Sequence, residues 1–255
     1  MKYRNLSGKR ILITGASSGI GRELAIKLAE KGCQIGLMAR REKELTLLAQ
    51  EISKLPGDAL VLPADVTKRS QVKKGLQRLI DKWGHLDILI ANAGIGLLHK
   101  AANLNTEKVE ATMQLNFYGT WYAIEAALPV MLTQGQGHIV AISSFAAFRG
   151  LPKTAPYSAS KAAIARFMES MRVELKDQGI DFTTIYPGFV RTPMTAGNRF
   201  KMPFILETSD AAAKIIRVIE KQKAEVIIPW QIAIFSYFIR ILPNAAFDRA
   251  AKYLS

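Results

Sequence analysis

Short apolar runs alternate along this chain with longer stretches in which apolar residues recur every three or four positions. Most of the runs are continuously apolar, which is typical of strands covered on both faces. The longer stretches have the period of amphipathic helices, and a glycine follows three of them. We therefore predict strands at 10–14, 34–38, 59–62, 86–91, 138–143, 182–186 and 225–228, and helices at 19–31, 42–54, 69–83, 106–132, 157–177 and 209–221.

This alternation of strands and helices predicts the fold class. It favours an α/β fold with a doubly wound, seven-stranded parallel sheet of the Rossmann type and helices on both faces. No repeat, low-complexity segment or linker divides the sequence, so we expect one domain over residues 1–255. Such a fold binds its ligand beyond the carboxyl ends of the strands, where candidate site residues are expected.

Composition narrows the class of protein. The 255 residues are 49% hydrophobic, enough for one large α/β core. A single cysteine, Cys33, excludes an internal disulfide and suits a reducing compartment, and the first nine residues carry no apolar signal segment. We expect a cytoplasmic protein.

The formal net charge of +14 favours anionic partners. No run of five Lys or Arg occurs, and no basic stretch is interleaved with aromatic residues, so nucleic acid is not expected as a partner. The sequence also contains no His, Cys, Asp and Glu pattern typical of a metal site.

A glycine turn follows the first predicted strand. Gly15, Gly19 and Gly21 lie between the apolar run at 11–13 and the first helical pattern. Glycine reaches positive φ and lets the backbone approach a ligand closely. The first turn of the next helix offers free N–H groups and a partial positive charge. This order is typical of a pyrophosphate-binding turn, and an ordinary strand–helix loop is the alternative.

Three further residues carry acid–base chemistry. Tyr157 and Lys161 are four positions apart at the start of a predicted helix, so they share a face. An ammonium beside a phenol favours the phenolate and lowers the phenol pKa from its usual value of about 10. Ser144 ends a predicted strand at the edge where the site belongs, with Ser143 as its competitor. A surface pair and a strand-end cap are the alternatives.

Taken together, these motifs resemble the short-chain dehydrogenase/reductase family in its compact, single-domain form, over residues 8–195. The resemblance is carried by the glycine turn at 14–21, Ala-Asn-Ala-Gly at 91–94, Leu-Asn at 115–116, the Ser144, Tyr157 and Lys161 set, and Pro187-Gly188 with Thr192. The segment at 91–94 departs from the family pattern, which begins with Asn.

The resemblance implies hydride transfer between a nicotinamide ring and a carbonyl or alcohol carbon. It assigns Tyr157 as the general acid or base, and Lys161 as the group that lowers the tyrosine pKa and holds the nicotinamide ribose. Ser144 would bond to the substrate oxygen, and Asn116 would hold a water in the proton path. The implied cofactor-binding residues are Gly15, Ser17, Ser18, Gly19, Ile20, Gly21, Arg40, Arg41, Asp65, Val66, Asn92, Ala93, Gly94, Tyr157, Lys161, Pro187, Gly188, Val190 and Thr192.

Two of these residues have specific expectations. Asp65 follows the third predicted strand and is the expected partner of the adenine amino group, with capping of the turn at Thr67 as the alternative. For Asn92 we expect a structural role that braces the strands beside the cofactor.

The end of the second predicted strand indicates which nicotinamide cofactor is used. NAD selection needs an acid that accepts from the ribose 2′-hydroxyl, but Ala39 stands at that position and Arg40 and Arg41 follow. A guanidinium suits a 2′-phosphate through bidentate, charge-assisted bonds. We therefore predict NADP(H), with Arg40 as the first candidate and Ser17 as an added hydroxyl. Arg41 either shares this role or is solvated at the helix start.

The substrate side is less specific. Residues 193–207 resemble the family's lid, and residues 94–99 are expected at the pocket rim, with His99 as a polar rim residue. The lid's apolar content predicts a hydrophobic carbonyl or alcohol substrate rather than a sugar. Its apolar residues are Met194, Phe200, Met202, Phe204, Ile205 and Leu206. Arg191, Arg199 and Lys201 are expected to be solvated, with contact to an anionic group as the alternative.

The C-terminal segment 229–255 departs from a generic member of the family. Residues 226–243 are strongly apolar with little helical sidedness, and a proline, a glutamine and an arginine interrupt them. A membrane span takes about 20 apolar residues, so a transmembrane helix is not predicted. The favoured interpretation is packing against the substrate pocket or a second subunit. The alternative is a membrane interface, supported by the basic surface and by Trp230, Tyr237 and Phe238.

We conclude from the sequence that the chain is an NADP(H)-dependent oxidoreductase of hydrophobic small molecules. The resemblance implies a homo-oligomer, a dimer or tetramer, paired through the helices at 106–132 and 157–177. Reduction is favoured because cells keep the NADP pool reduced. A non-catalytic dinucleotide-binding sensor or scaffold is the alternative, and retention of Ser144, Tyr157 and Lys161 together argues against it. A membrane-surface reductase of lipid carbonyls is compatible with the first conclusion.

Overall fold

A parallel sheet of seven strands forms the centre of the fold in the computed structural model, which describes residues 4–98, 100–103, 105–197 and 201–251. The strand order is β3-β2-β1-β4-β5-β6-β7, and the predicted fold class is confirmed. The strands are β1 Arg10–Thr14, β2 Gln34–Ala39, β3 Asp58–Pro63, β4 Ile88–Ala91, β5 Gly137–Ile142, β6 Ile180–Pro187 and β7 Glu225–Ile228.

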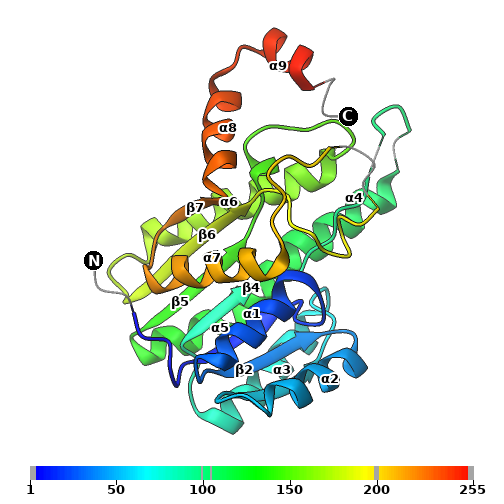
Figure 1. The fold of residues 1–255 in the computed structure, drawn as a ribbon. Helices are drawn as coiled ribbons and strands as arrows, with labels where there is room; N and C mark the ends of the chain where they lie inside the picture. Colours follow the sequence, from blue (N-terminus) through cyan, green and yellow to red (C-terminus); the bar gives the residue numbers. More distant parts are fainter. Residues whose placement is uncertain (1–3, 99, 104, 198–200, 252–255) are drawn as a thin grey trace.

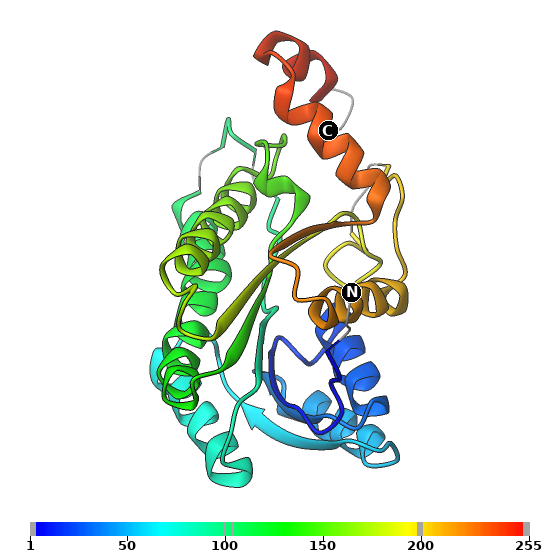
Figure 2. The same cartoon turned by 90° about the vertical axis from the view of Figure 1, so that its left-hand side faces the viewer.

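Helices cover both faces of this sheet (Figures 1 and 2). One layer consists of α1 Gly19–Glu30, α2 Glu42–Ile52 and α7 Thr208–Glu220, whose apolar stripes share one core cluster with the sheet. The other layer includes α3 Arg69–Trp83, α4 Thr106–Met113, α5 Gly119–Gln134 and α6 Ala155–Glu174. The apolar residues of α3, α5 and α6 form a second cluster with the opposite face of the sheet.

The structure corrects three details of the predicted elements. The helix predicted at 106–132 contains a π-helical turn at Gln114–Tyr118, which separates α4 from α5. The strand predicted at 138–143 ends one residue earlier, at Ile142, so Ser143 and Ser144 both follow it. The C-terminal apolar segment forms two helices, α8 Trp230–Ile241 and α9 Asn244–Ala251, which stand beyond the sheet (Figure 1).

The strand order brings four strand ends together. β1 pairs with β2 on one side and with β4 on the other, so the direction of winding reverses between β1 and β4. Registers of Ile13 with Ile90 and of Ile142 with Ile185 keep the carboxyl ends of β1, β4, β5 and β6 level. A ligand site is expected at such a switch point.

A buried carboxylate, that of Asp87, joins the amino-terminal ends of β1 and β4, at the edge of the sheet away from the switch point. Asp87 accepts hydrogen bonds from Lys9 Nζ at 2.7 Å and from the Arg10 backbone N–H at 2.9 Å. Burial by itself raises the pKa of Asp87, but these two bonds and the nearby charges of Lys9 and His85 outweigh it, so the pKa lies below its ordinary value. The ionised carboxylate therefore stabilises the alignment of the two strands.

We predict that Asp87→Asn lowers the free energy of unfolding by about 2 kcal/mol near neutral pH, because a charged acceptor of two hydrogen bonds is lost. The folded-state pKa lies below the unfolded value of about 3.9, so the stabilisation exists above that value and is lost as the pH falls through the folded-state pKa. Urea unfolding of both proteins at neutral and at acidic pH should show a difference that shrinks with acid. A difference that stays constant contradicts this account.

Candidate active site

A cavity of about 610 Å³ opens at the switch point. Its volume suits a small-molecule ligand, for which pockets of about 300–1,000 Å³ are usual. Most of the residues predicted for the site line it, namely Gly15, Ser17, Ser18, Gly19, Ile20, Arg40, Arg41, Val66, Asn92, Ala93, Gly94, Ser144, Tyr157, Lys161, Pro187, Gly188, Val190 and Thr192. Gly21, Asp65 and Asn116 are absent from this lining. Gly21 lies against Gly15 and Asn92, and Asn116 bonds to Ile95, all of which line the cavity.

The glycine turn between β1 and α1 needs its glycines for two physical reasons. Gly15 and Gly19 have φ of +68° and +56°, which L side chains rarely adopt. A Cβ at Gly21 would lie 2.4 Å from the Gly15 carbonyl oxygen, so the turn closes tightly on itself. The Ser18 side chain makes no cap bond to α1, which leaves the first-turn N–H groups available to a ligand.

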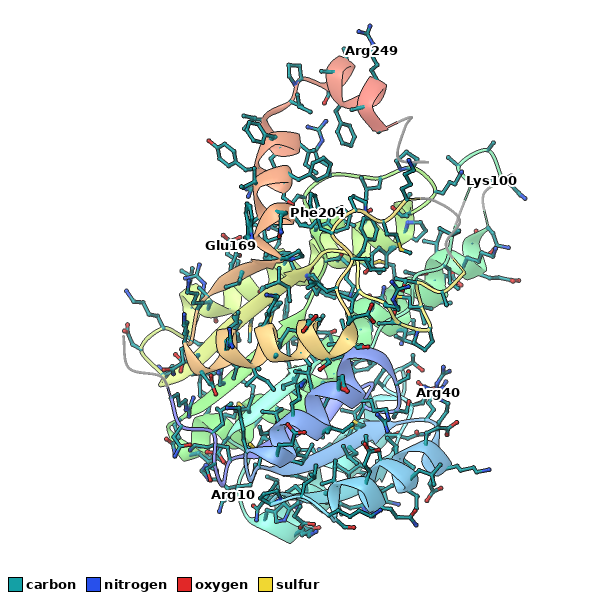
Figure 3. The ribbon with its side chains drawn as sticks, in the orientation of Figure 1. Arg10, Arg40, Lys100, Glu169, Phe204 and Arg249 are labelled. Atoms are coloured by element: carbon teal, nitrogen blue, oxygen red, sulfur yellow. The ribbon has the colours of Figure 1, made fainter. Side chains whose placement is uncertain are left out.

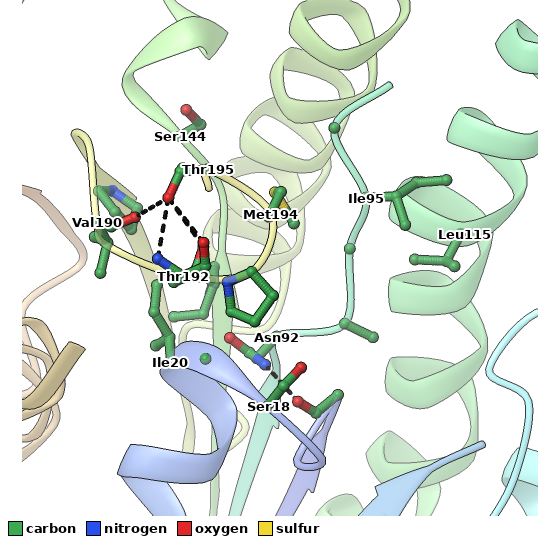
Figure 4. A pocket seen from close by; sticks show the side chains of 18 of the residues that line it. Ser18, Ile20, Asn92, Ile95, Leu115, Ser144, Val190, Thr192, Met194 and Thr195 are labelled. Atoms are coloured by element: carbon green, nitrogen blue, oxygen red, sulfur yellow. Dashed lines mark hydrogen bonds between the residues drawn. The ribbon is translucent and has the colours of Figure 1, made fainter. Parts of the chain in front are cut away.

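Asn92 joins the end of β4 to this turn. Its Nδ2 donates to the carbonyl oxygens of Thr14 and Gly15 at 3.0 and 3.3 Å. In return, Thr14 Oγ1 accepts from the backbone N–H groups of Asn92 and Ala93 at 3.0 and 3.1 Å. Figure 4 shows Asn92 among the side chains that line the cavity. The Asn92 side chain thus braces the two strand ends.

The two arginines after β2 differ in their contacts. The Arg41 guanidinium donates to Ser17 Oγ at 2.9 Å and to Ser18 Oγ at 2.7 Å, so it lies against the glycine turn. Arg40, the first candidate from the sequence, lines the same cavity and is exposed (Figure 3). The structure therefore places Arg41, rather than Arg40, on the hydroxyl groups of the turn.

Asp65 has the geometry of the capping alternative. Its Oδ1 accepts from the Thr67 N–H at 2.9 Å and from the Thr67 hydroxyl at 2.8 Å. Val66 lines the cavity, whereas Asp65 does not. Asp65 Oδ1 therefore caps the turn after β3, and the contact of Asp65 with the adenine amino group stays a prediction.

The two serines after β5 have separate roles. Ser143 Oγ donates to the Lys161 carbonyl oxygen at 2.9 Å, which ties β5 to α6. Ser144 Oγ accepts from the Ala146 N–H at 3.2 Å, and its hydroxyl faces the Tyr157 phenol, whose pKa it lowers. Ser144 therefore both caps the short helical turn Phe145–Ala147 and faces the phenol.

Burial controls the ionisation of the Tyr157 and Lys161 pair. Lys161 Nζ donates to the Ile142 carbonyl oxygen at 2.8 Å and lies 5.8 Å from the Tyr157 ring centroid. Burial lowers the pKa of Lys161 to about 8. Burial also raises the pKa of Tyr157, and the Ser144 hydrogen bond offsets only part of that rise. The expected lowering of the tyrosine pKa is therefore wrong for this structure, because desolvation penalises the charged form of each group.

Asn116 lies in the π-helical turn and is fully buried. Its amide group bonds to the backbone of Ile95 twice, with Oδ1 accepting from the N–H at 2.8 Å and Nδ2 donating to the carbonyl at 3.0 Å. Nδ2 also donates to Ser160 Oγ at 3.0 Å. A Cβ at Gly94 would lie 3.3 Å from Asn116 Oδ1 and 3.4 Å from Lys161 Nζ. Asn116 thus sets the position of the chain beside the lysine.

The segment after β6 closes one side of the cavity. Thr195 Oγ1 donates to the Val190 carbonyl oxygen at 2.7 Å and accepts from the Thr192 N–H at 3.0 Å (Figure 4). Val190 forms a bridge with Leu206, so the intervening segment is joined at its base. Thr195 was not predicted, because a Thr-x-x-Thr spacing has no chemical signature in the sequence.

The structure describes some, but not all, of the other residues predicted for the lid and the rim. Arg191 is exposed and pairs with Glu207 at 2.8 Å. His99, Arg199 and Phe200 lie outside the described residues. Ile95 and Leu97, which belong to the rim expected at 94–99, line the cavity, as does Leu115 of the Leu-Asn motif. Ile142 is an apolar lining residue that the sequence did not single out.

The geometry agrees with comparisons to known proteins. The family model of short chain dehydrogenases matches residues 9–202, and the chain belongs to this family of oxidoreductases. An uncharacterized oxidoreductase of Myxococcus xanthus is 41% identical over 249 residues, 98% of each chain. An 11-beta-hydroxysteroid dehydrogenase-like 2 of Arabidopsis thaliana is 38% identical over 236 residues, 90% of this chain and 76% of that protein.

A solved structure extends the similarity to the fold. The 3-ketoacyl-(acyl-carrier-protein) reductase from Brucella melitensis, complexed with NADH, superposes with a TM-score of 0.81 at 26% identity. The match covers 88% of this chain and 97% of that one. The family and the fold are therefore established by sequence and by structure.

We predict that Gly21→Ala lowers the free energy of unfolding by about 2 kcal/mol, because the new methyl group meets main-chain oxygen and must displace the turn. Gly150→Ala is the matched control, since a Cβ there meets nothing within 4 Å. Its effect should stay within about 0.5 kcal/mol. Chemical denaturation followed by circular dichroism measures both, and equal stabilities for the two variants would refute the close-packed turn.

Proposed function

We propose that the chain is an NADP(H)-dependent oxidoreductase, which transfers a hydride between nicotinamide and the carbonyl or alcohol carbon of a hydrophobic small molecule. The observation that carries the proposal is that Ser144, Tyr157 and Lys161 lie together in the cavity that the glycine turn lines, with the Ser144 hydroxyl facing the phenol. A sensor or scaffold that only binds a dinucleotide needs neither a buried phenol nor a buried ammonium. Burying a phenol and an ammonium costs free energy, and groups buried at such a cost in a cavity are typical of a catalytic site.

The glycine turn fits a dinucleotide. A Cβ at Gly15 would lie 2.8 Å from Ala93 Cα. The backbone of the turn thus approaches the backbone after β4 closely, and the absence of a side chain at Gly15 permits this approach. The uncapped first turn of α1 presents N–H groups suited to a pyrophosphate. We assign Lys161, Pro187 and Gly188 to the nicotinamide end. When bound, the nicotinamide supplies or accepts the hydride.

The side chains of the site supply the proton. In the reducing direction, Tyr157 gives its hydroxyl proton to the carbonyl oxygen while Ser144 donates a hydrogen bond to the same oxygen. Burial raises the pKa of Tyr157, so the phenol carries its proton at neutral pH and has one to give. The Lys161 ammonium stabilises the phenolate that remains. We assign Asn116, which bonds to the Ile95 backbone and lies with Lys161 beside Gly94, to the water that returns the proton.

The preference for NADP(H) rests on Arg41. Its guanidinium is held by Ser17 and Ser18 at the rim of the cavity, and Ala39 stands where an acid would select NAD. A fixed guanidinium with two neighbouring hydroxyls is suited to the 2′-phosphate of NADP(H). Arg40 lines the same rim and adds positive charge.

The remaining surface supports a hydrophobic substrate and self-association. Ile95, Leu97 and Met194 line the cavity on the side of the proposed lid, 193–207. Exposed apolar side chains lie on the helices proposed to pair subunits, including Leu132 on α5 and Val173 on α6. We propose a homo-oligomer assembled through these helices.

The test of the enzymatic proposal is NADPH oxidation with a panel of apolar ketones and aldehydes. Tyr157→Phe should lose at least about 100-fold in kcat, because the general acid is removed, and should still bind NADPH. Ser144→Ala should lose about 10- to 100-fold. Ser143→Ala is the matched control: Ser143 also lines the cavity, but its hydroxyl donates to the Lys161 main-chain oxygen, so most activity should remain. A Tyr157→Phe enzyme with the parent rate would exclude this mechanism.

The cofactor proposal has its own prediction. Arg41→Ala should raise the KM for NADPH about 10- to 100-fold, since charge-assisted bonds contribute about 1.5–3 kcal/mol each, and should leave the KM for NADH nearly unchanged. Arg40→Ala should have the smaller effect of the two. Steady-state kinetics with both cofactors measures this. A parent enzyme that uses NADH and NADPH equally well would show that the arginines do not select the cofactor.

A further inference from the structure

The helix α8 is apolar on both of its sides. Its buried side carries Ile232, Ser236 and Ile239. The opposite side carries five large apolar or aromatic side chains that are 49–67% exposed: Trp230, Ile234, Tyr237, Phe238 and Ile241. A helix at a protein surface normally turns charged and polar residues outward. The exposed side of α8 therefore indicates an interaction surface.

The position of α8 is held by specific contacts. Arg149 donates hydrogen bonds to the carbonyl oxygens of Ile239 and Leu242 at 3.2 and 3.1 Å, and its guanidinium lies 4.1 Å from the Phe247 ring centroid. At the other end of the helix, Ile232 packs so closely on Gly188 that a Cβ there would lie 2.7 Å from it. The exposed side is thus presented by an anchored helix.

The same apolar surface continues onto the proposed lid. Phe204 is 54% exposed, has a φ of +56°, and lies beside the lower end of α8 in Figure 3. A hollow of about 230 Å³ separates the two elements and is lined by residues of both, among them Phe204, Leu206 and Trp230. We define the docking face as Phe204, Trp230, Ile234, Tyr237, Phe238 and Ile241.

We propose that the docking face lies on the surface of an anionic lipid bilayer. The net charge of +14 attracts the chain to such a surface. The helices α8 and α9 contain two basic residues, Arg240 and Arg249, and one acidic residue, Asp248, so their net charge is positive. Figure 3 shows Arg249 at the outer end of the α8–α9 unit. Lys201 and Lys153, which belong to segments next to these helices, are exposed.

The side chains and the length of α8 suit the plane of the bilayer interface. Trp and Tyr favour the boundary between hydrocarbon and headgroups, and Trp230 and Tyr237 are both exposed on this face. In the described part of the chain no helix combines the length and apolarity needed to span a membrane. With 12 residues, α8 is roughly 18 Å long and lies along the interface.

A bilayer fits this face better than a second copy of the chain. The face combines Trp230 and Tyr237, which favour the bilayer interface, with the positive charge of Arg240 and Arg249 and of the chain as a whole. A second copy would bring the same positive charge to the contact, and like charges oppose association.

The experiment is sedimentation of the full chain with vesicles of equal parts phosphatidylcholine and phosphatidylglycerol, and with pure phosphatidylcholine vesicles. We expect binding to the anionic vesicles that weakens with salt. Phe238→Gln/Ile241→Gln should lower the partition coefficient at least about tenfold, because two apolar side chains no longer enter the interface. Leu47→Gln, which changes an exposed apolar residue on α2, is the matched control and should bind like the parent.

Two further measurements separate the outcomes. Emission of Trp230 should shift to the blue with anionic vesicles, and the shift should disappear in Trp230→Phe. Failure of the parent to sediment, or equal binding by the parent and the double variant, overturns the proposal. A double variant that instead breaks an oligomer, with no vesicle binding by the parent, assigns the face to a second copy. NADPH oxidation by the soluble protein is measured separately, so loss of the docking proposal leaves the enzymatic one intact.

Discussion

The pairing of β1 with β4 is the constraint on which the site depends. Because these strands are neighbours in the sheet although two others separate them in the chain, the loops after both strands open toward the same space. Asp87 holds one end of this pair and Asn92 the other, where its amide bonds to Thr14 and Gly15. The glycine turn is therefore held from the side by β4 as well as by its own backbone. Loops after β5 and β6 complete the cavity, which is why residues far apart in the sequence line it together.

Burial shifts the pKa values of Tyr157 and Lys161 in opposite directions. It raises the pKa of Tyr157 and lowers that of Lys161, so each group is shifted toward its neutral form. Neighbouring groups hold both side chains: the Ile142 carbonyl oxygen accepts from Lys161 Nζ, and the Ser144 hydroxyl faces the phenol and lowers its pKa. A charge that develops during proton transfer in this dry environment interacts strongly with the remaining members of the set. The arrangement therefore favours a phenol that keeps its proton until a substrate oxygen is present.

The C-terminal helices connect to the same site through two contacts. Ile232 of α8 packs on Gly188 at the cavity wall, and Phe204 shares a hollow with Trp230. Arg149, which anchors α8 and α9, extends from the segment that follows Ser144. The helix α8 therefore packs directly on residues that form the walls of the cavity. Attachment of that surface to a bilayer would orient the opening between the proposed lid and α8 relative to the lipid.

The sequence alone determined the order of strands and helices, the fold class and the family, because apolar periodicity and the glycine and Tyr-x-x-x-Lys spacings are local properties. It put Ser144 before Ser143, in agreement with the structure, but it also put Arg40 before Arg41, whereas Arg41 contacts the turn. Those choices depend on the direction of each side chain after its strand ends. The π-helical turn at Asn116, the sign of the Tyr157 pKa shift and the exposed side of α8 were also decided by tertiary structure. Each depends on what other parts of the chain bury, since desolvation and exposure are set by contacts between segments distant in the sequence.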